Sequence, residues 1–282
     1  MRIVRKLALN FGWRALLVLG SFTYLRFVLV FFCNARAILR AGDLSPIDRA
    51  MGSRPIKVHM NENDFVLDCL YTDQHVQDGT FTFGIVREMY IRNCYLRYGV
   101  AEAARKARTV LDLGANRGAF SIMMARQANL VIAVEVNPLF KEAIAHNMAI
   151  NGFTNYAVEI AIVGGGGACG EENSHGLTIP ELLQKHNLES VDLVKMDIEG
   201  SEFELFRSPE WLTRISALCM EVHPKYGNPQ EVITALEQHA FDFVVADQNF
   251  LSVDNLERAE FIYAWKQNNK GCPVFQSTSS LT

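Results

Sequence analysis

From residue 109 onwards the chain alternates between short apolar runs and longer stretches with amphipathic, helix-like spacing. The runs that predict strands are 109–113, 130–136, 156–163, 191–198, 217–222, 241–246 and 261–265. The stretches that predict helices lie between most of them, at 119–127, 138–150, 180–187, 202–206 and 229–239. Apolar strands alternating with helices indicate an α/β fold, a mostly parallel sheet with helices on both faces. No strong helical period joins the last two runs, so we expect them to pair antiparallel at the sheet edge.

Residues 41–105 are more polar and carry a mixed pattern. Short strands are expected at 57–60 and 65–70, and helices at 84–96 and 101–107. We interpret this region as an α/β lead-in that precedes the main fold.

The most apolar segment, 15–33, is interrupted by one charge, Arg26. As a helix it would be about 28 Å long, close to the thickness of a bilayer's hydrocarbon core. An arginine at mid-bilayer costs about 2.5–3.5 kcal/mol on insertion scales, so a span is marginal. The competing geometry is a helix lying in the interface, with Arg14, Arg26 and Arg36 toward lipid head groups. Two further interpretations are a helix packed on the protein and a signal peptide cleaved near 35–37.

Charge sets this segment apart from the rest of the chain. Seven of the 27 basic residues and none of the 31 acidic residues lie in the first 40 positions, which therefore face a different environment. The net charge of −4 argues against a general polyanion-binding protein, so we expect no nucleic-acid partner. A hydrophobic content of 49% excludes disorder. The six cysteines include no C-x-x-C pair, which disfavours a zinc knuckle or a thioredoxin-like motif.

The first chemical motif is VLDLGANRG at 110–118. A strand ends near Asp112 and turns through Gly114, Asn116 and Gly118 into a helix, which lets the backbone approach a ligand. A dinucleotide fingerprint requires G-x-G-x-x-G, whereas this turn has Asn116 in place of the second glycine. Asp112 would repel phosphate and could receive an ammonium group. The turn therefore suits a nucleoside that bears an amino acid better than NAD.

The second motif is LVIAVE at 130–135, which ends in Glu135. In doubly wound sheets an acid at that place hydrogen-bonds both ribose hydroxyls. Asn137 opens the next helix and is counted with Glu135 among the cofactor-binding residues. The alternative is that Glu135 only favours the N-terminus of that helix.

The third motif, VDLVKMDIEGSE at 191–202, places Asp197 and Glu199 at the end of a strand. Glu202 follows on a helix, and three carboxylates this close need a compensating partner. Lys195 alternates onto the same face as Asp197 and is one such partner. The alternative is that the acids cap the following helix.

Together these segments resemble the FkbM-like family of S-adenosylmethionine-dependent methyltransferases. The resemblance is carried by VLDLGANRGAFS, AVEVNP, the Asn-rich stretch around 147–151 and LVKMDIEGSEFELF, and extends from about 109 to 224. It implies a class I Rossmann-like fold with a seven-stranded sheet, S-adenosylmethionine as cofactor, and methyl transfer, usually to an oxygen on a sugar or secondary metabolite. The apolar N-terminus and the glycine run at 164–167 depart from the family pattern.

A hydroxyl acceptor is a poor nucleophile, so a base or a metal should assist it. The candidates at carboxyl strand ends are Asp197, Glu199, Glu202, Glu221 and His223. His223 can take a proton near neutral pH, and we place it with Asp197 and Glu199 as the catalytic residues. We expect no metal, with Asp197 and Glu199 as the only weak candidate ligands. His175 is expected near the adenine rim or in solvent.

The sequence thus predicts four parts: an apolar basic segment (1–40), a lead-in (41–105), a methyltransferase domain (106–268) and a flexible tail (269–282). We expect O-methylation of a hydroxyl on a sugar, glycolipid or secondary metabolite, with a small-molecule or glycan acceptor. The methyl donor is made in the cytosol, which favours a cytoplasmic enzyme held at a membrane by its N-terminal segment. The basic residues before the apolar run favour the opposite arrangement, in which the domain lies outside the cytoplasm. The alternatives are an inactive methyltransferase-like binding module and, less favoured, an NAD-dependent oxidoreductase.

Overall fold

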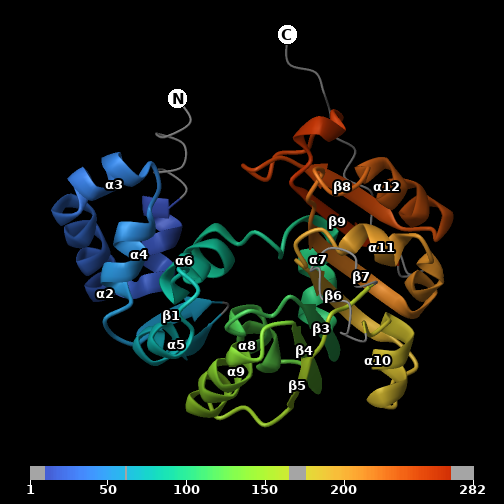
Figure 1. The fold of residues 1–282 in the computed structure, drawn as a ribbon, viewed down its shortest axis with the longest axis horizontal. Coiled ribbons are helices and arrows are strands. Elements are labelled where there is room, and N and C mark those ends of the chain that lie inside the picture. Colours follow the sequence, from blue (N-terminus) through green and yellow to red (C-terminus); the bar gives the residue numbers. More distant parts are fainter. Residues whose placement is uncertain (1–9, 61, 165–175, 268–282) are drawn as a thin grey trace.

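The computed structural model describes residues 10–60, 62–164 and 176–267. In this part of the chain a seven-stranded sheet has the order β5-β4-β3-β6-β7-β9-β8 (Figure 1). Its strands are β3 (Thr109–Leu113), β4 (Leu130–Glu135), β5 (Tyr156–Ile160), β6 (Val191–Met196), β7 (Ile215–Glu221), β8 (Asp242–Ala246) and β9 (Phe261–Trp265). The first five pair in parallel, whereas β9 runs antiparallel to both β7 and β8. The predicted sheet is confirmed: its last two strands pair antiparallel, with β8 at the edge and β9 running against its two neighbours.

Helices cover both faces of this sheet because its buried strands alternate their side chains between two cores. Val110 of β3 belongs to the core shared with α7 (Tyr98–Lys106), α8 (Ala119–Ala125) and α9 (Leu139–Ile150). Leu111 and Leu113 belong to the core shared with α10 (Ile179–Lys185), α11 (Glu202–Phe206) and α12 (Pro229–Gln238). The short 3-10 helices η2 (Pro209–Arg214) and η3 (Leu256–Arg258) complete the connections.

The N-terminal part packs beside the sheet as a layer of helices around a hairpin (Figure 1). It contains α2 (Trp13–Cys33), α3 (Ala35–Ala41), α4 (Ser45–Met51), β1 (Ile56–Met60), β2 (Asn63–Leu67), α5 (Cys69–His75), α6 (Thr82–Val86) and the π-helix η1 (Arg87–Arg92). Phe27 of α2, Val58 of β1 and Ile122 of α8 belong to one hydrophobic core. Helix α3 runs across residue 40, so the first segment and the lead-in are joined both in sequence and in packing.

Two lead-in expectations differ from the structure for local reasons. The strand expected at 65–70 stops at Leu67, because the Asp68 side chain accepts a hydrogen bond from Tyr71 N (3.1 Å) and caps α5. The helix expected at 84–96 is divided between α6 and η1 and ends where Asn93 takes a left-handed φ of 53°. A π-helical turn of this kind is found frequently at functional sites.

Candidate active site

A cavity of about 710 Å³ lies at the carboxyl ends of β3, β4, β6 and β7. Its sheet-side wall includes Gly114, Asn116, Glu135, Asp197, Glu199 and Glu221. Its opposite wall comes from the N-terminal part and includes Asp43, Leu44, Thr80, Phe81, Glu88, Arg92 and Tyr95. The strand order reverses at β3, which is where open α/β sheets bind their ligands.

The glycine turn after β3 is fixed by its neighbours. The amides of Gly114 and Ala115 both donate to the carbonyl oxygen of Val134, each at 2.9 Å. Gly114 has a φ of 73°, and a Cβ there would lie 1.8 Å from the Asp197 carbonyl oxygen. Only glycine fits at such a position, so the turn brings bare backbone to the cavity wall. Gly118 has a φ of 76° and begins α8, but it packs against Ile144 rather than lining the cavity.

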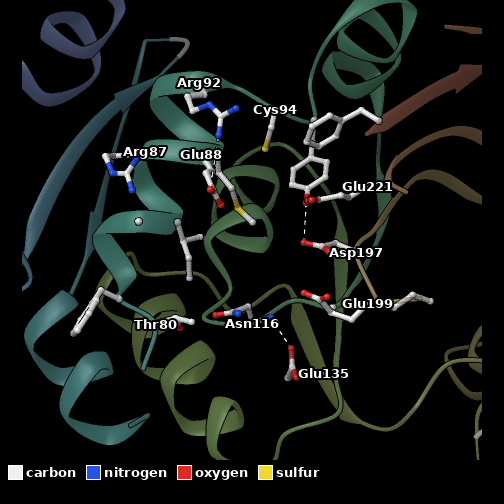
Figure 2. Close-up of a pocket in the computed structure, with 18 of the residues that line it drawn as sticks. Thr80, Arg87, Glu88, Arg92, Cys94, Asn116, Glu135, Asp197, Glu199 and Glu221 are labelled. Carbon is white, nitrogen blue, oxygen red and sulfur yellow. Dashed lines mark hydrogen bonds and ion pairs between the residues drawn. The ribbon is translucent and has the colours of Figure 1, made fainter. Parts of the chain in front are cut away.

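Glu135 is held at the cavity wall by two backbone donors. Its Oε2 accepts from Asn116 N at 2.8 Å (Figure 2), and its Oε1 accepts from Asn137 N at 3.0 Å. Each carboxylate oxygen has further acceptor capacity, so the group can still take two hydroxyl donors. Asn137 does not line the cavity, and its side chain accepts from Leu139 N at the start of α9. Asn137 therefore fixes Glu135 and the helix, rather than facing a ligand.

Asp112 requires a correction, because its side chain is fully buried and does not line the cavity. Ser121 Oγ donates to it at 2.6 Å, and Lys195 Nζ lies 3.3 Å from its other oxygen. Lys195 stands opposite Asp112 in the β3–β6 register and also donates to the carbonyl of Gly114 at 2.6 Å. Burial alone lowers the pKa of Lys195, but the carboxylates of Asp112 and Asp197 outweigh it and raise that pKa. The ammonium group expected beside Asp112 is thus that of Lys195, not that of a ligand. The Lys195–Asp112 pair supports the glycine turn from the buried side, through the bond to the Gly114 carbonyl.

Carboxyl groups are concentrated in the part of the sheet-side wall that follows β6 and β7. Figure 2 shows Glu221, Asp197 and Glu199 following one another along one wall, with Glu88 facing them from η1. Tyr95 OH donates to Asp197 at 2.9 Å, which holds that carboxylate in place. Burial, and after it the charge of Asp197, raises the pKa of Glu221 to about 8. A carboxyl group with a pKa in this range can exchange a proton near neutral pH.

His223 does not fit the role of a neutral base. Its Nδ1 lies 2.9 Å from Oε1 of the buried Glu202, which also accepts from the His223 amide at 2.9 Å. This hydrogen bond outweighs burial and raises the pKa of His223 to about 9, so the ring is protonated at neutral pH. Its Nε2 lies 3.5 Å from Glu199. The imidazolium therefore compensates the carboxylates instead of accepting a proton from an acceptor.

Side chains of Asp197, Glu199 and His223 also place one ligand-type atom each within 4.8 Å of one another. A metal there would bind His223 at Nε2 and displace the proton of that nitrogen, while the Nδ1–H would keep its hydrogen bond to Glu202. Of the other sequence candidates, His175 and residues 165–167 of the glycine run lie outside the described residues.

Motif reasoning missed the wall contributed by the N-terminal part. Arg117, inside the first motif, is fully buried and donates to Thr80 Oγ1 at 2.8 Å and to the Thr80 carbonyl at 3.2 Å. It also lies 3.2 Å from an oxygen of Asp78. The arginine thereby ties the glycine turn to the 78–81 segment that closes the cavity. The position of Arg117 between Asn116 and Gly118 was the one sign in the sequence that this residue matters to the site. Its partners could not be identified, because they are remote in sequence.

A family model and several solved structures are similar to this chain. Residues 112–243 match the family model described as Methyltransferase FkbM domain. Among solved structures the chain is similar to precorrin-6y C5,15-methyltransferase of Geobacter metallireducens GS-15, at 18% identity over 59% of this chain and 87% of that one, with a TM-score of 0.39. It is also similar to M. jannaschii TYW2 in complex with AdoMet, at 16% identity over 74% and 84% of the two chains, with a TM-score of 0.39. The comparison with curated proteins gave no match.

Proposed function

Residues 112–243 are a domain of the FkbM methyltransferase family, and from this we propose that the protein is an S-adenosylmethionine-dependent O-methyltransferase. Its acceptor would be a hydroxyl group on a sugar, glycolipid or secondary metabolite. The observation that carries the proposal is Glu135, a carboxylate fixed by two backbone amides at the wall of a cavity that also receives the glycine turn.

The residues present fit the cofactor. Glu135 offers acceptors for a ribose diol, and the turn at Gly114 brings bare backbone to the cavity wall. The carboxylates of Asp197 and Glu199 favour a cationic group in the cavity. A volume of about 710 Å³ is within the range of ligand sites. When bound, S-adenosylmethionine supplies the methyl group and takes the electron pair of the broken methyl–sulfur bond.

The chain's own part in the reaction is to position the acceptor and remove its proton. As the oxygen–methyl bond forms, the hydroxyl proton passes to a carboxylate of the Asp197–Glu221 pair. Glu221 suits this step because its raised pKa makes it a stronger base than an ordinary glutamate. Tyr95 and the His223 imidazolium hold Asp197 and Glu199 in place.

Calorimetry with S-adenosylmethionine and S-adenosylhomocysteine tests the proposal. We expect binding to the wild type and a loss of roughly tenfold or more for Glu135→Ala, since the variant lacks the diol acceptor. Glu237→Ala, an exposed glutamate on α12, is the control and should bind as the wild type does. Absence of binding to either compound would refute the proposal. Binding without any methyl transfer would favour a binding module.

We also propose a cytoplasmic protein in peripheral contact with a membrane. Helix α2 is long and apolar enough to cross a bilayer by length and composition, and much of it is exposed. The support for a cytoplasmic location is the supply of the methyl donor. Fractionation of full-length protein into membrane and soluble pools tests it.

A further inference from the structure

Helices α2 and α3 carry an exposed apolar face at the edge of the molecule remote from the sheet (Figure 1). Seven of the fifteen exposed large hydrophobic side chains in the described residues lie there: Trp13, Leu17, Phe22, Leu25, Leu29, Phe32 and Leu39. Phe22 is 78% exposed and Leu39 is 80% exposed. The positions 22, 25, 29 and 32 recur at helical spacing and therefore share one face. Such a patch marks an interaction surface.

The opposite face of α2 packs against the rest of the protein. Val18 and Phe27 are buried, and the helix bends at Gly20, where the added Cβ would lie 3.2 Å from His59. Arg26 donates to the carbonyls of Ala50 and Met51, each at 3.1 Å, and Arg14 donates to that of Tyr90 at 3.3 Å. These two arginines therefore do not reach toward head groups as the sequence led us to expect. A membrane span would break these contacts, so they favour contact with a bilayer through the exposed face alone.

Charge identifies the surface that suits this face. Between residues 10 and 42 the chain has four arginines and no acidic residue. Arg36 and Arg40 on α3 are exposed beside Phe32 and Leu39. Apolar side chains flanked by free arginines match an anionic bilayer, which takes up the former and attracts the latter.

The chain continues from this face into the lining of the active-site cavity. Helix α3 ends at Ala41, Gly42 reverses the chain with a φ of 76°, and the next two residues, Asp43 and Leu44, line the cavity. The segment that contacts the membrane thus continues directly into the cavity rim. A molecule at the bilayer surface can reach the carboxylate wall across residues 43–45.

Resting on the proposed function, we infer that residues 13–40 lie in the plane of an anionic membrane and that the methyl acceptor is a lipid with a neutral, hydroxylated head group. The carboxylates of Asp197 and Glu199 in the cavity wall repel a phosphate placed beside them and accept hydrogen bonds from hydroxyls. A glycosyl head group combines these properties, whereas phosphatidylglycerol supplies only the surface charge.

A sedimentation assay with vesicles of phosphatidylcholine and about one-third phosphatidylglycerol tests the membrane contact. The wild type should co-sediment, and the triple variant Phe22→Glu, Phe32→Glu, Leu39→Glu should lose roughly tenfold or more of its vesicle affinity. Leu251→Glu, exposed outside this face, is the control and should bind normally. All three proteins should bind S-adenosylhomocysteine equally, which shows that fold and cofactor site are intact. Wild-type protein that resists alkaline extraction from the vesicles would indicate a span and overturn the in-plane assignment. A wild-type dimer that is lost in the triple variant would overturn it too, because the apolar face would then be a protein interface.

Labelled methyl transfer tests the acceptor class. The same vesicles are doped with monoglucosyl diacylglycerol, and label is expected in that lipid, not in phosphatidylglycerol. The triple variant should transfer at least roughly tenfold less, in line with its vesicle affinity. Label only in phosphatidylglycerol, or no label in lipid from protein that binds S-adenosylhomocysteine, would overturn the inference. Failure to bind S-adenosylhomocysteine at all would instead overturn the proposed function on which it rests.

Discussion

The carbonyl oxygen of Asp197 occupies the space beside Gly114 that a side chain would need, 1.8 Å from where a Cβ would stand. The amide of Asp197 in turn donates to the Leu113 carbonyl at 3.0 Å. The loops that follow β3 and β6 are therefore locked together. One contains the glycine turn and the other the acidic wall, so their separation is set by backbone contacts alone.

We predict that Gly114→Ala abolishes binding of S-adenosylhomocysteine and lowers stability by more than about 2 kcal/mol, because it adds a steric clash to a left-handed φ. Calorimetry and urea denaturation measure the two effects. Gly152→Ala is the matched control, since Gly152 has a φ of 74° with open space around its Cβ position. It should cost only about 1–2 kcal/mol and leave binding unchanged. Equal losses in the two variants would contradict the contact with Asp197.

Lys195→Met should destabilise the protein by about 3–5 kcal/mol, since it leaves Asp112 buried without its counter-charge. Adding Asp112→Asn should recover part of that loss in a double-mutant cycle measured by urea denaturation. The exposed Lys57–Asp64 pair provides the control, and Lys57→Met should cost less than about 1 kcal/mol. If the double variant is no more stable than Lys195→Met alone, the result would contradict the coupling between Lys195 and Asp112.

Turnover should rise with pH and level off above about pH 8, because Glu221 must be ionised to accept the hydroxyl proton. Glu221→Gln should lower kcat by roughly a hundredfold or more and remove that rise. The pH profile of kcat is the measurement, and the exposed Glu257→Gln on η3 should keep the wild-type profile. A Glu221→Gln profile that still rises toward pH 8 would contradict the assignment of the proton to Glu221.

The raised pKa of His223 predicts a second pH dependence, in stability. Since its folded-state pKa is about 9 against an ordinary 6.5, its stabilisation is complete below about pH 6.5 and is lost as pH rises through 9. The wild type should therefore exceed His223→Gln in unfolding free energy by on the order of 1–3 kcal/mol at pH 6, and by much less at pH 9.5. Urea titrations at both values measure this, and a constant difference would contradict the ion pair with Glu202.

The sheet could be predicted from sequence because buried strands require apolar runs whatever their neighbours are. The observed β3 and β9 coincide with the runs at 109–113 and 261–265. Gly114, Asn116 and Glu135 lie together at the cavity wall, because strand, turn and helix are contiguous in the chain. Local sequence specifies all of these features.

The charge states and the far wall of the cavity could not be predicted in this way. Tyr95 reaches Asp197 across 102 positions, and Lys195 reaches Asp112 through the sheet register. His223 becomes a cation only because Glu202, on another element, is buried beside it. Such partners are chosen by tertiary packing, and neither spacing nor residue type at one position reveals them.

The position of β9 gives the chain a direction of assembly. β9 pairs with β7 and β8 on its two edges, and β8 pairs with no other strand in the described part of the chain. During synthesis β7 and β8 therefore leave the ribosome before β9, the strand that lies between them. Their pairing with β9 can be completed only after residue 265 has been made. The strands that carry the glycine turn can pair earlier. The ribosome thus releases the cofactor half of the sheet first, and the last-made strand closes an apolar edge that would otherwise be open to aggregation.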